Sequence, residues 1–125
     1  MDRVDILNLF CLKDRVALVT GAAEGIGRAI AEGLACFGAD VVISDINEER
    51  LTQTAQEISL VGGRVEIIHC DNSQPDQIYK MFEQVDRIFN KLNILVNNVG
   101  IIIRKHPEEL TLHEWEQVLR INLTG

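Results

Sequence analysis

Short apolar runs alternate with amphipathic stretches along the chain. Val16–Val19 and Val41–Ile43 are continuous apolar runs, which is typical of strands buried on both faces of a parallel sheet. The stretch after each run places apolar side chains three and four residues apart, the spacing of a helix face. We therefore predict strands at 15–20, 40–44, 64–69 and 92–96, and helices at 25–37, 48–60, 74–89 and from about 112 onward.

This alternation predicts an α/β fold, with a parallel sheet covered by helices on both faces and right-handed crossovers. Residues 1–125 are expected to form one partial domain, in which residues 1–13 are a lead-in whose apolar side chains pack on the domain edge. Asn47, Ser73 and Thr111 are the predicted helix caps, and Thr111 forms a capping box with Glu114.

Two helices have predicted buried faces that bear on the later argument. The face of the first helix is formed by Ile26, Ile30, Gly33, Leu34 and Phe37. The face of the last helix is formed by Trp115, Val118 and Leu119, and Asn122 continues the same stripe. A polar side chain on such a face needs a hydrogen-bond partner, so Asn122 is either a buried structural amide or a functional residue.

Composition and net charge argue against several classes of function. A net charge of −7 and a pI near 4.9 argue against binding to nucleic acid or to an anionic membrane surface. The cysteines Cys11, Cys36 and Cys70 are odd in number and widely spaced, which argues against a disulfide framework or a zinc site. No signal peptide or membrane-length apolar run is visible, and a cytoplasmic location with reduced thiols fits these features.

A glycine-rich turn joins the first strand to the first helix. Its spacing is G-x-x-x-G-x-G, formed by Gly21, Gly25 and Gly27 after Thr20. Gly21 allows a tight turn, Gly25 lets the backbone approach a pyrophosphate, and Gly27 lets the helix lie against the strand. The helix N-terminus then offers free N–H groups to an anion. Taken alone, the motif also fits an ordinary tight turn.

Polar residues follow the other three strands, at the edge where parallel sheets bind ligands. They are Asp45, Asp71 and the run Asn97–Gly100. Asp45 lies 18 residues after Gly27, close to the roughly 20 expected of a carboxylate that binds an adenosine ribose. Alone, Asp45 could equally be a helix-capping residue, but together with the glycine-rich turn it is predicted to be a ligand.

The charge pattern predicts NAD rather than NADP as the cofactor. Asp45 would accept a hydrogen bond from a free 2′-hydroxyl and repel a 2′-phosphate. Glu24 adds a second negative charge within the turn. No Arg or Lys stands in the turn or directly after Asp45, and Arg50 is expected on the solvated face of the second helix.

These motifs together resemble the short-chain dehydrogenase/reductase family. Thr20–Gly27 resembles its T-G-x-x-x-G-x-G turn, and Asn97–Gly100 resembles its N-N-A-G motif with Val99 in place of alanine. Asn122 resembles the asparagine of the helix after the fourth strand. The resemblance runs from about Leu12 to the end of the chain. It implies a Rossmann-type sheet of strand order 3-2-1-4, truncated after the helix that follows strand four.

The resemblance also implies roles for individual residues. Gly21, Gly25 and Ile26 would cradle the pyrophosphate, in a turn that also contains Glu24 and Gly27. Asp45 would hold the adenine ribose, with Ile46 against the adenine, and Asp71 and Asn72 would meet the adenine edge. Asn98, Val99 and Gly100 would line the second ribose, while Asn97 would mainly fix the turn after strand four. Asn72 and Val99 depart from the family pattern. Asn122 would help to position a water in the proton relay.

The family's catalytic serine and Tyr-x-x-x-Lys are not matched. Tyr79 is the one tyrosine, and Glu83 stands where the lysine would be. We therefore predict the cofactor-binding half of an NAD-dependent dehydrogenase, with very slow hydride transfer by these residues alone. Its substrate would be a small secondary alcohol or ketone, such as a sugar acid or 3-oxoacyl thioester. A homo-oligomer is expected for the full-length form, and no metal is. The alternative is a non-catalytic dinucleotide-binding or assembly module, or an inactive truncated fragment.

Overall fold

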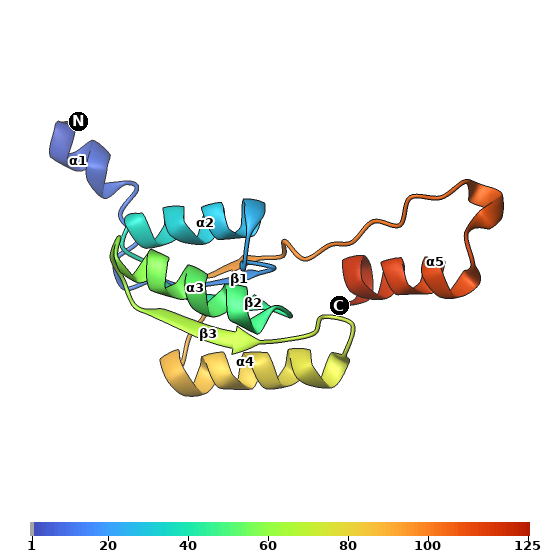
Figure 1. The fold of residues 1–125 in the computed structure, drawn as a ribbon. Coiled ribbons are helices and arrows are strands. Elements are labelled where there is room, and N and C mark those ends of the chain that lie inside the picture. The colour runs from blue at the N-terminus through green and yellow to red at the C-terminus, as the bar shows by residue number, and fades with distance from the viewer. Residues whose placement is uncertain (1) are drawn as a thin grey trace.

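The computed structural model describes residues 2–125, in which four strands form one parallel sheet (Figure 1). The strand order is β3-β2-β1-β4, as the family resemblance implied, and the Rossmann-type α/β fold is confirmed. Each strand begins and ends within two residues of its predicted position. The strands are β1 Val16–Thr20, β2 Asp40–Asp45, β3 Val65–His69 and β4 Ile94–Val96.

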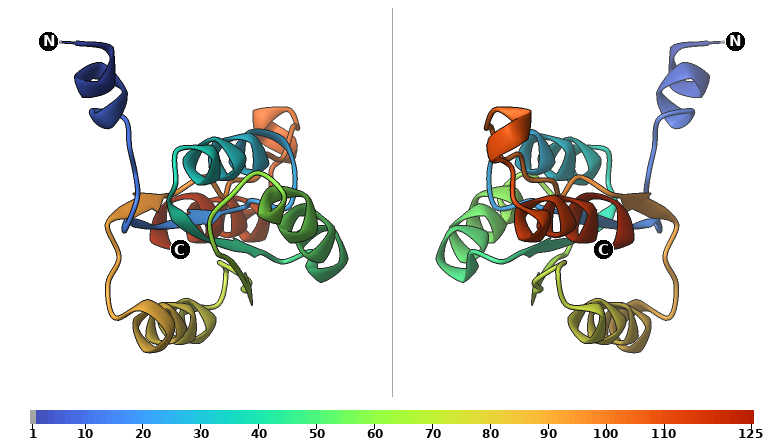
Figure 2. Two further views of the ribbon diagram at one scale, coloured as in Figure 1. Left: turned by 90° about the vertical axis from the view of Figure 1, so that its left-hand side faces the viewer. Right: turned by 90° about the vertical axis from the view of Figure 1, so that its right-hand side faces the viewer.

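Helices cover both faces of the sheet, as predicted (Figures 1 and 2). Helices α2 (Gly25–Cys36) and α3 (Glu48–Ser59) pack on one face, and α4 (Pro75–Phe89) packs on the other. Two apolar clusters follow from this arrangement, one around Ile43 and Leu51 and one around Leu18 and Met81. Among residues 2–125, no helix has the length and apolar character needed to cross a membrane.

The packing face of α2 differs from the predicted one. Its buried residues are the small ones, Gly27, Ala31 and Ala35, at a spacing of four. Ile26 is 75% exposed and Phe37 55% exposed, so their predicted burial is wrong. Small side chains let the helix approach the sheet closely, and the larger apolar groups then fall outside the contact. Only the middle of the predicted stripe, Ile30 and Leu34, packs partly against the core.

The lead-in contains a short helix, α1 (Arg3–Asn8), none of whose side chains is buried. It projects away from the sheet (Figure 1). Only the end of the lead-in packs on the domain. Leu12 lies against the core and its N–H donates to the carbonyl oxygen of Phe37 at 2.8 Å, while the rings of Phe10 and Phe37 lie 6.5 Å apart.

The segment after β4 runs past the strand ends and returns as α5 (Leu112–Leu119), after the 3₁₀ turn η1 (Pro107–Glu109). The predicted capping box of Thr111 and Glu114 is present. Helix α5 lies beyond the carboxyl ends of the strands and not on a face of the sheet (Figure 2). Trp115 and Leu119 are consequently 55% and 40% exposed, and their predicted burial is wrong. The π-helical turn η2 (Arg120–Thr124) continues directly from α5.

Candidate functional site

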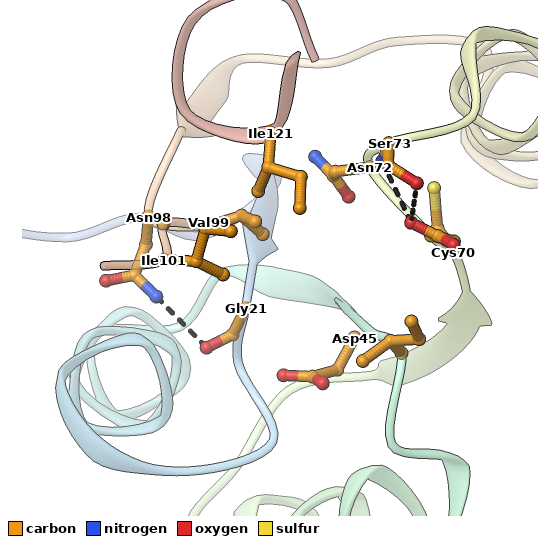
Figure 3. A pocket seen from close by; sticks show the side chains of 12 residues that line it. Gly21, Asp45, Cys70, Asn72, Ser73, Asn98, Val99, Ile101 and Ile121 are labelled. Atoms are coloured by element: carbon orange, nitrogen blue, oxygen red, sulfur yellow. Dashed lines mark hydrogen bonds between the residues drawn. The ribbon is translucent and has the colours of Figure 1, made fainter. Parts of the chain in front are cut away.

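A pocket of about 270 Å³ opens at the carboxyl ends of the strands (Figure 3). Eight predicted site residues line it: Gly21, Asp45, Ile46, Asp71, Asn72, Asn98, Val99 and Gly100. Cys70, Ser73, Ile101 and Ile121 line it too and were missed, although each lies within two residues of a predicted site residue. The other predicted residues, Glu24, Gly25, Ile26, Gly27 and Asn122, lie outside the lining.

The glycine-rich turn leaves room for an anion beside the first turn of α2. Gly21 and Gly25 have φ values of 65° and 63°, a conformation that favours glycine. A Cβ atom at Gly25 would meet nothing within 4 Å, so the space beside this residue is open. Glu24 precedes α2 and makes no side-chain capping hydrogen bond. The first N–H groups of the helix therefore remain available, and the turn fits a phosphate group.

Asn98 fixes the glycine-rich turn to the end of β4. Its Nδ2 donates to the carbonyl oxygens of Thr20 at 3.1 Å and Gly21 at 3.0 Å (Figure 3 draws the second bond), and its backbone N–H donates to the Thr20 hydroxyl at 3.1 Å. The resemblance implied that Asn97 would mainly fix the turn after strand four; Asn97 is exposed, and the bonds to the glycine-rich turn come from its neighbour Asn98.

Gly27 is required by the same close packing. A Cβ atom on this residue would lie 2.4 Å from the carbonyl oxygen of Gly21 and 2.5 Å from Nδ2 of Asn98. Helix, turn and β4 therefore meet at a point where no side chain fits. This agrees with the sequence-based interpretation that Gly27 permits the helix to lie against the strand.

Asp45 connects β2 to the glycine-rich turn. Its Oδ2 accepts a hydrogen bond from the Ala23 N–H at 3.1 Å, and its Oδ1 accepts one from the Asn47 N–H at 3.0 Å. The cap of α3 is Asn47, as predicted, which removes the alternative that Asp45 caps this helix. A carboxylate has about four acceptor positions, so both oxygens keep capacity for a ligand in the pocket that Asp45 lines.

A buried threonine of α3 holds the glycine-rich turn by a hydrogen bond. The Thr54 hydroxyl on α3 donates to the carbonyl oxygen of Ala23 at 2.7 Å. Thr54 is 1% exposed, so this bond satisfies a polar side chain inside the core. Ala23 is thus held through its N–H by Asp45 and through its carbonyl by Thr54.

Two ion pairs join α3 to the region of the turn. Arg50 pairs with Glu24, and Arg28 of α2 pairs with Glu57. Arg50 is 56% exposed, in agreement with its predicted place on the solvated face of the helix, and its ion pair with Glu24 was not predicted. Its guanidinium partly neutralises the negative charge that Glu24 brings to the turn.

The segment after β3 folds back on Asp71. The backbone N–H and the hydroxyl of Ser73 donate to Oδ1 of Asp71 at 2.9 and 2.7 Å (Figure 3). Ser73 therefore does not cap the next helix as predicted; the capping position of α4 is Gln74, with Pro75 as the first helical residue. The pKa of the adjacent Cys70 thiol is raised, mainly by burial and further by the carboxylates of Asp71 and Asp76.

Asn122 has a hydrogen-bond partner, as the prediction for a polar residue on an apolar stripe required. Its Oδ1 accepts from the Ile101 N–H at 2.8 Å, and its Nδ2 donates to the Ile101 carbonyl oxygen at 2.9 Å. The side chain is exposed, not buried, so the structural-amide alternative is wrong in its burial. It lies in η2, and such π-helical turns are frequent at functional sites. Asn122 thereby ties the last helix to a segment that lines the pocket.

Residues 15–125 match the family model for short chain dehydrogenases. The chain belongs to the short-chain dehydrogenase family. Members of this family are oxidoreductases that bind nicotinamide cofactors. Within residues 2–125, no cluster of His, Cys, Asp and Glu side chains could hold a metal ion.

Individual relatives agree with this assignment. The chain is 40% identical over 115 residues to a 3-oxoacyl-[acyl-carrier-protein] reductase of Aquifex aeolicus, covering 91% of the chain and 46% of that relative. It is 37% identical over 121 residues to a 2-dehydro-3-deoxy-D-gluconate 5-dehydrogenase of Pseudoalteromonas atlantica, covering 96% and 48%. The short-chain dehydrogenase chain thus spans about half the length of these curated relatives.

Solved structures share the fold. A short-chain type dehydrogenase/reductase from Mycobacterium marinum superposes with a TM-score of 0.90 at 35% identity, covering 95% of this chain and 48% of that one. A metagenomic short-chain oxidoreductase in complex with NADP superposes with a TM-score of 0.87 at 36% identity, covering 90% and 52%.

Proposed function

We propose that this chain is the cofactor-binding half of an NAD-dependent oxidoreductase that interconverts a secondary alcohol and a ketone. The observation that carries the proposal is the convergence of the glycine-rich turn, Asp45 and Asn98 at one edge of the sheet, beside an open helix N-terminus. A dinucleotide needs both halves of this arrangement, namely a phosphate cradle and acceptors for its ribose hydroxyls.

Each part of the site has a proposed task. The turn formed by Gly21, Gly25 and Ile26 binds the pyrophosphate with the N-terminus of α2. Asp45 holds the adenine ribose while the exposed Ile46 covers the adenine, whose edge meets Asp71 and Asn72. The stretch Asn98–Gly100 lines the second ribose. When bound, the nicotinamide ring supplies the hydride-transfer chemistry.

The preference for NAD rests on Asp45. The carboxylate lines the pocket and retains acceptor capacity, so it suits a 2′-hydroxyl and disfavours a 2′-phosphate at the same place. The NADP in the metagenomic relative belongs to that protein. The expectation here therefore depends on this chain's own charges.

The acid–base residues of turnover lie outside these 125 residues in this proposal. Tyr79 stands in α4, 73% exposed, and is not followed by a lysine at the required spacing. Asn122 contributes as a positioning residue through Ile101. The substrate is proposed to be a small alcohol or ketone such as a sugar acid or 3-oxoacyl thioester, which accords with the names of two relatives.

Calorimetric titration with NADH and NADPH tests the proposal. We expect NADH to bind the more tightly, by about tenfold, as one removed charge–charge repulsion of ~1.4 kcal/mol would give. Asp45→Asn should abolish that preference. Asp40→Asn is the matched control, because Asp40 lies at the other end of β2 and accepts a bond from the Arg64 N–H. Absence of NADH binding, or tighter binding of NADPH to the unmodified protein, would contradict the proposal.

A further inference from the structure

We infer that the Glu24–Arg50 ion pair reinforces the NAD preference that rests on Asp45, by withholding Arg50 from a 2′-phosphate. The inference rests on the proposed function and concerns the same ribose site. Arg50 is the third residue of α3 and follows Asp45 by five positions, while Glu24 belongs to the glycine-rich turn. The pair therefore connects the two segments between which an adenine ribose would lie.

The hydrogen bonds around Ala23 place the pair beside Asp45. Asp45 accepts from the Ala23 N–H, and Glu24 is the next residue along the chain. Asn47, whose N–H donates to the other oxygen of Asp45, accepts in turn from the Arg50 N–H at 3.1 Å. Glu24 is thus the chain neighbour of one residue that contacts the Asp45 carboxylate, and Arg50 is hydrogen-bonded to the other.

The exposure of the pair makes Arg50 available for another partner. The side chains of Arg50 and Glu24 are 56% and 65% exposed. Exposed ion pairs contribute about 0–1 kcal/mol, so Glu24 holds Arg50 back from a stronger ligand by about that amount and no more. A phosphate is such a ligand, because it carries more charge and accepts two parallel N–H bonds from an arginine.

Charge at this edge then explains the role of Glu24. With Glu24 in place, Arg50 is already paired, and Asp45 is the charged residue of these three that lines the pocket. Without Glu24, Arg50 balances Asp45 and is free to bind a 2′-phosphate. NADH has no such phosphate, so the loss of Glu24 must change the affinities for the two cofactors by unequal amounts.

The test compares NADH and NADPH affinities of the purified protein by calorimetry. For Glu24→Gln we expect the ratio of NADPH to NADH affinity to rise by up to about fivefold, the factor that corresponds to the ~1 kcal/mol of an exposed ion pair. The double variant Glu24→Gln/Arg50→Gln should lose this gain. The gain should also shrink when the salt concentration is raised from about 50 to about 500 mM, because the higher concentration screens an exposed contact.

Glu57→Gln is the matched control. It releases Arg28 from the other ion pair between α2 and α3. Any contact that Arg28 gains with a pyrophosphate is common to both cofactors, so the affinity ratio should stay unchanged.

The outcomes separate this inference from the proposed function. A Glu24→Gln variant with an unchanged ratio overturns the inference, because Arg50 then does not reach the phosphate. A gain that persists in the double variant also overturns it, because Glu24 then acts by repulsion alone. If the unmodified protein binds neither cofactor, the proposed function itself fails and the inference falls with it.

Discussion

Nδ2 of Asn98 lies 3.0 Å from the carbonyl oxygen of Gly21, a residue 77 positions earlier in the chain. A single amide at the end of β4 thus holds the turn that follows β1. The glycine-rich turn is commonly considered as a local strand–turn–helix unit. In this chain its conformation depends on a residue just after β4, a strand that comes three strands after β1.

Replacing Asn98 with alanine should loosen the turn. The change leaves the carbonyl oxygens of Thr20 and Gly21 without their shared donor. We expect a loss of about 1–3 kcal/mol in the free energy of unfolding, together with weaker NADH binding. Urea denaturation and NADH titration measure the two effects. The exposed neighbour Asn97 is the control, and Asn97→Ala should change neither stability nor NADH affinity. An equal effect of both substitutions would contradict the clamp, meaning the hydrogen bonds by which Asn98 holds the glycine-rich turn.

Two glycines of α2 should respond in opposite directions to alanine. At Gly27 the new Cβ meets the carbonyl oxygen of Gly21, and we expect a loss of about 1–3 kcal/mol or more from overpacking. At Gly33 the Cβ meets nothing within 4 Å, and the higher helix propensity of alanine should add about 0.5–1 kcal/mol. The midpoints of urea denaturation should therefore move apart; a shift of both in one direction would refute the packing argument.

Thr54 should matter more than its neighbour Thr52. Thr54→Val keeps the shape of the side chain but leaves the Ala23 carbonyl oxygen without a buried donor, at a cost of about 1–3 kcal/mol. Thr52 bonds the Glu48 carbonyl oxygen on the exposed side of the same helix, so Thr52→Val should stay within about 0.5 kcal/mol. Because Ala23 also binds Asp45, NADH affinity should fall in the first variant alone.

The Cys70 thiol should make stability fall at alkaline pH. Burial and two nearby carboxylates raise its pKa above the ordinary 9.0 in the folded state. The folded protein therefore retains this proton more strongly than the unfolded chain does. The resulting stability is present below pH 9.0 and is lost as the pH rises through the folded pKa. Between neutral pH and pH ~10.5, the free energy of unfolding should fall more steeply in the unmodified protein than in Cys70→Ala.

Alkylation provides an independent check of the same thiol. Cys11 and Cys36 are exposed and should react with iodoacetamide at neutral pH, while the buried Cys70 should react only after denaturation. Mass spectrometry counts the added groups. Rapid modification of all three thiols in the folded protein would contradict the burial of Cys70.

The sequence was sufficient for the sheet and insufficient for the outer helices. Continuous β-branched runs and caps such as Asn47 are local signals, so the strands and α3 could be located closely. Burial is not a local property. The prediction placed the large apolar side chains of Ile26 and Phe37 on the buried face of α2. In the structure, close packing against the sheet buries the small Ala31 and Ala35 instead.

The candidate site shows the same division. Residues at strand ends could be predicted because parallel strands present their carboxyl ends at one edge, and Asp45 lines the pocket accordingly. The partner of a given side chain could not be predicted. Nothing in the spacing distinguishes Asn97 from Asn98, or identifies Glu24 as the partner of Arg50, because those contacts depend on the twist and separation of segments far apart in the chain.

The clamp formed by Asn98 also sets an order of events during synthesis. The glycine-rich turn leaves the ribosome 77 residues before the amide that holds it. At about 5–20 residues per second, this interval is on the order of 4 to 15 s. Throughout that time the nascent chain carries the glycine-rich turn without the hydrogen bonds of Asn98 that hold it. On the proposed function, cofactor present during translation therefore stabilises only chains in which β4 has already joined the sheet, which favours correctly paired strands.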